Sequence, residues 1–280
     1  MSDPLVSSAW LAERLGSDHI RVVDATWAMP GEPRTGAQAY AASHIPGAVF
    51  FDIDTIADQA TDLPHMLPPA AVFAEAAGNL GLRRDLTIVV YDAQGIFSAP
   101  RVWWTLRTMG FPQVRVLDGG LLKWRAEGRS TETAAPQPSL EVVEPAFEPD
   151  LVRDLAALRR TLAAREAQVI DARPGPRFRG EVPEPRAGLR GGHMPGALNV
   201  PWGGLMNADG TMKSDAELRA AFQSAGVDLD GPIVTTCGSG VSASLLALAL
   251  ARLGRDDVAV YDGSWSEWGG RTDTPVVTGG

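Results

Sequence analysis

Residues 233–243 read Ile-Val-Thr-Thr-Cys-Gly-Ser-Gly-Val-Ser-Ala and contain the only cysteine of the chain, Cys237. The first four residues are all β-branched, which is typical of a buried strand. A glycine-rich turn follows, and residues 244–253 then show the apolar pattern of a helix that Gly254 ends. The stretch therefore predicts a strand, a tight loop and a helix, with the cysteine where the strand ends.

The flanking sequence continues the same alternation. Short apolar segments at 169–170, 198–200 and 258–261 predict further strands. Residues 215–225 predict a helix, because Ser214 and Glu217 together form a capping box at its start. Strands that alternate with helices favour an α/β fold, a parallel sheet flanked by helices.

The chain contains this pattern twice, since several landmarks recur in the same order and at nearly constant spacing. They are Asp24-Ala25 with Asp171-Ala172, residues 44–48 (His-Ile-Pro-Gly-Ala) with 193–197 (His-Met-Pro-Gly-Ala), residues 87–92 with 232–237, and 116–120 with 260–264. Between the copies lies a proline-rich segment without strong periodicity. We therefore expect one domain over 1–130, a linker over 131–150 and a second domain over 151–280.

The composition narrows the classes of function. The 280 residues carry a net charge of −9 and show no basic run, which argues against a nucleic-acid binder. One cysteine cannot form an internal disulfide, the start of the chain does not resemble a signal peptide, and the longest apolar run, 245–251, is too short to span a membrane. We therefore expect a cytoplasmic protein with no membrane and no nucleic-acid partner.

The loop that contains Cys237 is suited to covalent chemistry. Gly238 and Gly240 permit positive φ angles, so successive N–H groups can point inward as a cradle for an anion. The following helix adds its positive N-terminal end, and both effects favour a thiolate, the nucleophilic form of cysteine. The alternative, a buried cysteine that only fills space, does not explain the two glycines.

Three other classes of site do not fit these residues. A protein tyrosine phosphatase needs an arginine six residues after the cysteine, where this chain has Ala243. A thioredoxin-type motif needs a second cysteine where Gly240 stands. Four histidines and one cysteine are scattered without ligand spacing, so we expect no metal site.

Together, the duplicated His-Ile/Met-Pro-Gly-Ala motif, the Cys-Gly-Ser-Gly-Val loop and residues 261–268 (Tyr-Asp-Gly-Ser-Trp-Ser-Glu-Trp) resemble the tandem-domain rhodanese sulfurtransferases. The form of the cysteine loop resembles the 3-mercaptopyruvate sulfurtransferase branch, and the likeness extends over nearly the whole chain. It implies two tandem rhodanese-like domains, each a parallel sheet flanked by helices. It also implies that the first copy is catalytically inert, and there Asp92 stands in the place of Cys237.

The resemblance also suggests site residues. Arginines matching Arg177 and Arg186 bind the carboxylate and carbonyl of the substrate in mercaptopyruvate enzymes, and a guanidinium suits a carboxylate. Ser239 is a candidate proton relay, with a purely structural loop hydroxyl as the alternative. The remaining loop residues are expected to bind the substrate: Gly238, Gly240, Val241 and Ser242.

Two further residues have weaker assignments. A relay role has been suggested for the position of His44 in related enzymes, but His193 occupies the same motif place in the second copy. We therefore expect a structural role, fixing the turn before proline and glycine, and keep the relay as the alternative. For Arg179 we expect a surface or structural ion pair.

The predicted reaction moves sulfane sulfur from 3-mercaptopyruvate through a Cys237 persulfide to a thiol or cyanide, and it releases pyruvate. The expected partners are a small-molecule sulfur donor and a thiol acceptor such as a thioredoxin-like protein, with no cofactor. One alternative is a thiosulfate sulfurtransferase, although basic residues are missing directly after Cys237. The other is a non-catalytic persulfide carrier, which would not need the two arginines.

Overall fold

The computed structural model describes residues 3–29 and 31–279, which form two compact units. The first contains the described residues up to Gln59, Leu67–Glu148 and Asn207–Met212; the second contains Ala60–Met66, Pro149–Met206 and the described residues from Lys213. Two short segments therefore belong to the other unit than the repeat predicts: Ala60–Met66 lies in the second unit and Asn207–Met212 in the first. In the first unit, for example, the Met212 N–H donates to Asp118 Oδ1 at 2.8 Å.

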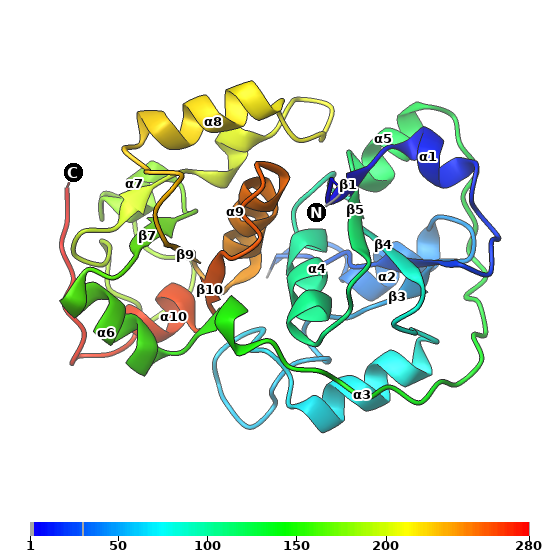
Figure 1. Ribbon diagram of the computed structural model, residues 1–280, viewed down its shortest axis with the longest axis horizontal. Helices are drawn as coiled ribbons and strands as arrows, with labels where there is room; N and C mark the ends of the chain where they lie inside the picture. The colour runs from blue at the N-terminus through cyan, green and yellow to red at the C-terminus, as the bar shows by residue number, and fades with distance from the viewer. Residues whose placement is uncertain (1–2, 30, 280) are drawn as a thin grey trace. The chain divides into compact units, whose positions relative to one another are not determined.

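The first unit contains one five-stranded sheet with helices between its strands (Figure 1). Its strands are β1 (Leu5–Val6), β2 (Ile20–Asp24), β3 (Val49–Phe50), β4 (Thr87–Tyr91) and β5 (Val114–Leu117). Its helices are α1 (Ser8–Ala12), α2 (Gly36–Ala42), α3 (Ala70–Asn79), α4 (Ala99–Thr108) and α5 (Gly120–Ala126).

The second unit repeats this arrangement. Its strands are β6 (Val152–Arg153), β7 (Gln168–Asp171), β8 (Leu198–Asn199), β9 (Ile233–Thr236) and β10 (Ala259–Tyr261). Its helices are α6 (Leu155–Ala164), α7 (Gly175–Phe178), α8 (Asp215–Ser224), α9 (Val241–Arg252) and α10 (Ser264–Trp268), with 3₁₀ turns η1 (Pro149–Leu151) and η2 (Trp202–Leu205).

Both sheets have the same topology. The strand orders are β1-β5-β4-β2-β3 and β6-β10-β9-β7-β8, and every pairing is parallel. Each copy buries a matching core, in which Leu117 and Trp124 of the first correspond to Tyr261 and Trp268 of the second. The predicted fold class, two tandem units with parallel sheets flanked by helices, is confirmed.

Most predicted elements of the second copy lie where the sequence places them. Strand β9 has the predicted bounds, and the capping box of Ser214 and Glu217 starts α8. The helix after Cys237 begins at Val241, three residues earlier than predicted. The reason is Gly240, whose φ of +81° makes it the N-cap, so the helix begins directly after the glycine.

The proline-rich segment before the second unit packs along the first. Its backbone donates hydrogen bonds from Glu141 to Gly78 at 3.1 Å and from Ala146 to Met109 at 3.1 Å. A segment that lies against a folded unit needs such partners for its polar backbone groups. The part of the chain expected as a linker is therefore fixed to the first unit up to Glu148.

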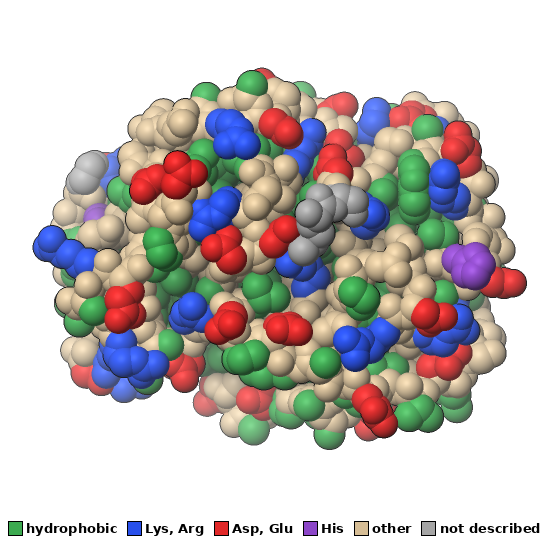
Figure 2. All heavy atoms as spheres, viewed as in Figure 1, with side chains coloured by type: hydrophobic (Ala, Val, Ile, Leu, Met, Phe, Trp, Pro, Cys, Tyr) green, Lys and Arg blue, Asp and Glu red, His purple; other side chains and the backbone are tan. Residues whose placement is uncertain are grey.

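The structure shows where the charged side chains lie on one face and how apolar the helices are. On the face that Figure 2 shows, basic and acidic side chains are interspersed. Within the described residues, no helix has both the length and the hydropathy that crossing a bilayer requires.

The loop after β4 shows what the first copy does with its cradle. The Asp92 carboxylate is buried and accepts four backbone N–H groups, from Gln94 at 2.9 Å, Phe97 at 2.7 Å, Ser98 at 3.0 Å and Ala99 at 2.9 Å. Burial raises the pKa of Asp92, and the N–H donors oppose that rise. The acid side chain thus occupies its own anion site at the start of α4.

We predict that Asp92→Asn destabilises the protein by about 1–3 kcal/mol, because the amide keeps one acceptor oxygen but turns an NH₂ group toward a backbone N–H. Thermal unfolding at neutral pH measures the change. The control is Asp85→Asn, which alters an exposed pair with Arg83 and should have little effect. Equal melting temperatures for Asp92→Asn and the unmodified chain would contradict the assignment.

Candidate active site

Cys237 lies at the carboxyl edge of the second sheet, between β9 and α9. Strand β9 pairs in parallel with β7, so that Thr236 lies opposite Asp171 and the Ala172 N–H donates to Thr236 O at 2.9 Å. The loops after both strands therefore meet at one edge, as the sequence predicts. Cys237 is a free cysteine and only 2% exposed.

The turn between β10 and α10 holds the cysteine loop from one side. The Ser264 hydroxyl accepts the Cys237 N–H at 3.2 Å and donates to Tyr261 O at 2.9 Å. Trp265 N–H donates to Cys237 O at 2.9 Å, and both the N–H and the hydroxyl of Ser266 donate to Gly238 O. These contacts fix the backbone of Cys237 and Gly238.

The sequence alone does not place this turn in the site. Ser264 has φ of +50°, a left-handed conformation that non-glycine residues rarely adopt. The equivalent residue in the first copy is Gly120, which has φ of +51°. A serine at a position where the repeat has glycine is the signal that points to Ser264.

The other N–H groups of the loop remain available to a ligand. Among the residues that the structure describes, none accepts a hydrogen bond from the backbone N–H groups of residues 238–242. These include the first N–H groups of α9, which have no partner within the helix. Unpartnered N–H groups at this place are what the predicted anion cradle requires, and in the first copy the equivalent groups bind Asp92.

The predicted loop residues all lie around this cradle. Gly240, Val241 and Ser239 are buried, and Ser242 is partly exposed on the first turn of α9. The Ser239 hydroxyl forms no hydrogen bond to any residue in the described part of the chain. The structural alternative for Ser239, a hydroxyl that satisfies the loop backbone, therefore has no contact to support it.

Arg177 reaches the cysteine loop. It lies in α7, directly after β7, and its Nη2 would be 3.2 Å from a Cβ placed on Gly238. The same Nη2 donates to Glu184 Oε2 at 2.5 Å, and Nε donates to Glu184 Oε1 at 3.3 Å. The structure thus brings the predicted arginine and the predicted loop together.

Glu184 belongs to a buried ionic cluster that our sequence analysis did not identify. It also accepts from Arg173 Nη1 at 2.9 Å, and Arg173 pairs in turn with Asp171 at 2.6 Å. Burial alone would lower the pKa of Arg173, but Asp171 and Glu184 raise it above its ordinary value. Arg173 therefore remains charged in the buried cluster.

Arg186 contacts His65. In the sequence His65 lies in the first copy, but in the structure it belongs to the second unit. Arg186 Nη2 lies 3.4 Å from His65 Nε2. Since a guanidinium only donates hydrogen bonds, Arg186 is the donor in this contact. His65 is buried with φ of +60°, and no histidine in the second copy matches it, which is the signal that distinguishes it from His44.

Arg179 behaves as the sequence analysis expects for a surface residue. Its guanidinium forms a two-point pair with Glu181, with distances of 2.7 Å and 2.9 Å. Both side chains are well exposed. Exposed pairs of this kind contribute little to stability, and we assign Arg179 no role in the site.

His44 and His193 make equivalent contacts in the two units. His44 is fully buried, its Nδ1 lies 2.8 Å from Tyr40 O, and its ring stacks on Tyr40. His193 Nδ1 lies 2.9 Å from Phe178 O, and its ring stacks on Phe178. Because both copies use the histidine to fix the same turn, the geometry favours the structural role over a relay.

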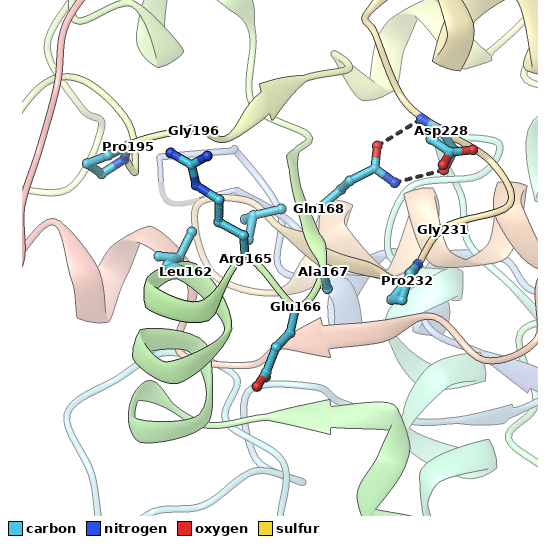
Figure 3. Close-up of a pocket in the computed structure, with 11 residues that line it drawn as sticks. Leu162, Arg165, Glu166, Ala167, Gln168, Pro195, Gly196, Asp228, Gly231 and Pro232 are labelled. Carbon is cyan, nitrogen blue, oxygen red and sulfur yellow. Dashed lines mark hydrogen bonds between the residues drawn. The ribbon is translucent and has the colours of Figure 1, made fainter.

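A hollow of about 770 Å³ lies at the opposite edge of the second sheet (Figure 3). Gln168 begins β7 there, and its side chain exchanges hydrogen bonds with the Asp228 backbone at 2.7 Å and 2.8 Å. Pro232, directly before β9, also lines it. The hollow is therefore at the amino ends of the strands that present Cys237 at their carboxyl ends.

Comparisons with known proteins agree with the duplicated architecture. The family model for the rhodanese-like domain matches residues 7–127 and 154–271. A 3-mercaptopyruvate sulfurtransferase from Escherichia coli (strain K12) is 47% identical over 272 residues, which cover 97% of this chain and 96% of the relative. A thiosulfate sulfurtransferase from Rattus norvegicus is 42% identical over 271 residues, which cover 94% of this chain and 91% of the relative.

A solved structure extends the agreement to three dimensions. The crystal structure of SseA, a 3-mercaptopyruvate sulfotransferase from Escherichia coli, matches with a TM-score of 0.87 at 44% identity, covering 94% of this chain and 99% of that one. Both halves match one family model, and the relatives align over nearly their full length. This chain therefore belongs to the rhodanese family and carries two rhodanese-like domains in tandem.

Proposed function

We propose that this chain is a 3-mercaptopyruvate sulfurtransferase that carries the transferred sulfur on Cys237. The observation that carries the proposal is the pairing of an open N–H cradle at Cys237 with the Arg177 guanidinium beside Gly238. The cradle suits a negatively charged sulfur, and the guanidinium suits a carboxylate. The 47% identical relative of that name supports the choice of donor.

In the first half-reaction the Cys237 thiolate attacks the sulfur of 3-mercaptopyruvate. A sulfur–sulfur bond forms, the bond between C3 and sulfur breaks, and its electron pair moves into the enolate of pyruvate. Arg177 and Arg186 bind the carboxylate and the carbonyl oxygen, so they stabilise the charge that develops there. Ser239 relays a proton to C3, which completes pyruvate and leaves a persulfide on Cys237.

In the second half-reaction an acceptor removes the outer sulfur. A thiolate or cyanide attacks that sulfur, the sulfur–sulfur bond breaks, and Cys237 departs as the thiolate that begins the next cycle. The N–H groups of residues 238–242 hold the negative charge in both states. We propose a reduced thioredoxin-like protein as the protein acceptor and cyanide as the laboratory acceptor.

Two alternatives make different kinetic predictions. A thiosulfate sulfurtransferase, the activity named for the 42% identical relative, would use thiosulfate at least as efficiently as 3-mercaptopyruvate. A non-catalytic carrier would use neither. The measurement is kcat/KM for both donors with cyanide as acceptor, and a ratio in favour of thiosulfate would reject the proposed donor.

We predict that Cys237→Ser abolishes sulfur transfer from every donor, because a serine hydroxyl is far less ionised than a thiol. Thiocyanate formation from cyanide measures the activity, and circular dichroism checks that the fold is retained. Activity above roughly a hundredth of the unmodified chain would remove Cys237 as the covalent centre, since loss of an essential nucleophile costs several orders of magnitude.

We predict that Arg186→Leu raises KM for 3-mercaptopyruvate by roughly thirty- to a thousand-fold, because the donor loses one charge-assisted hydrogen-bond contact. A persulfide formed beforehand should still discharge to cyanide at a nearly normal rate, because that step needs no carboxylate contact. Arg179→Leu, in the same segment but paired with exposed Glu181, is the matched control and should leave KM unchanged. A normal KM in Arg186→Leu would contradict its contact with the donor.

A further inference from the structure

The segment from Pro183 to Pro185 combines exposed prolines with a buried acid. Pro183 and Pro185 are exposed, but the Glu184 side chain between them is only 1% exposed. The prolines fix their own φ angles, and Pro185 restricts the backbone of Glu184 as well. A stiff surface segment thus presents one carboxylate to the interior.

That carboxylate joins two arginines, of which one lies beside the cysteine loop and the other packs on a residue that is hydrogen-bonded to the loop. Arg177 places Nη2 beside Gly238. Arg173 stacks over the Trp265 ring, 4.2 Å from its centroid, and the backbone N–H of Trp265 donates to Cys237 O. Glu184 Oε1 accepts from Arg173, and both of its oxygens accept from Arg177.

The first copy provides an internal comparison. Asp24 occupies the place of Asp171 there, and each carboxylate accepts the N–H two residues later, at 2.8 Å and 2.9 Å. At the place of Arg173, however, the first copy has Thr26. The turn after the strand therefore forms without the arginine, and the link from Arg173 to Glu184 belongs to the copy that contains Cys237.

We propose that Glu184 is a positioning residue for the sulfur-donor step, which holds the Arg177 guanidinium in place beside the Cys237 loop. This inference rests on the proposed function, because it assumes that Arg177 contacts the carboxylate of the donor. Among the residues that the structure describes, Arg177 donates side-chain hydrogen bonds only to Glu184. Its Nη1 thus remains for a ligand, and the side chain is still 21% exposed.

The physical effect is preorganisation. An unrestrained arginine has many rotamers and would lose that freedom when the donor binds. The two contacts to Glu184 restrict the guanidinium before binding, so less freedom remains to be lost. Because Arg173 also binds Glu184 through Oε1, the carboxylate that contacts the arginine beside Gly238 is itself held by a second, buried guanidinium.

The test uses Glu184→Gln, which keeps the size of the side chain but leaves one acceptor oxygen for two guanidiniums. Arg173 remains paired with Asp171, so we expect the variant to fold. We expect KM for 3-mercaptopyruvate to rise roughly tenfold, while a persulfide formed beforehand discharges to cyanide at the normal rate. Glu181→Gln, which removes the exposed partner of Arg179, is the matched control and should behave as the unmodified chain.

A double-variant comparison separates positioning from a general structural role. In an Arg177→Leu background, Glu184→Gln should change KM by less than about twofold, because the group that it positions is already absent. Should Glu184→Gln fail to fold, Glu184→Asp replaces it in both backgrounds, since its shorter carboxylate cannot reach both arginines.

Three results would overturn the inference alone: a normal KM in the variant, the same rise in both backgrounds, or equal slowing of sulfur uptake and discharge. Each requires that the unmodified chain takes up sulfur from 3-mercaptopyruvate normally. If the unmodified chain takes up none, the proposed function fails and the inference fails with it.

Discussion

The parallel pairing of β7 with β9 is the constraint on which the candidate site depends. It places Asp171 opposite Thr236, so that the loop after each strand leaves the sheet at the same edge. One loop supplies Cys237 and the open N–H groups, and the other supplies Arg177. A shift in this register would separate the thiol from the guanidinium, although both loops would keep their own sequences.

The two copies use the same loop position in different ways. In the first, Asp92 accepts N–H groups from four residues and leaves no reactive side chain in the loop. In the second, Cys237 takes the equivalent place and the N–H groups of residues 238–242 stay available. The buried pair of Arg173 and Glu184 lies in the copy that contains Cys237, and the first copy has Thr26 at the place of Arg173.

The sequence predicts those parts of the site that follow local rules. Alternating strands and helices, the internal repeat and the glycines around Ser239 locate the cysteine loop and its partner edge. The sequence does not reveal the role of Glu184. The residue lies in an exposed proline segment without hydrophobic periodicity, so nothing in the pattern indicates that its side chain is buried against two arginines. For Ser264 the sequence offers only the exchange of a glycine for a serine between the copies, because its left-handed backbone and its bond to the Cys237 N–H are visible only in three dimensions.

The central claim, that Cys237 carries the sulfur between donor and acceptor, is tested most directly by intact-mass spectrometry. Cys237 is the only cysteine of the chain, so any persulfide must form there. After brief exposure to 3-mercaptopyruvate the mass should rise by ~32 Da, one sulfur atom, and cyanide should reverse the rise. Pyruvate release followed by thiocyanate formation, with no such mass increase at any time, would contradict the account.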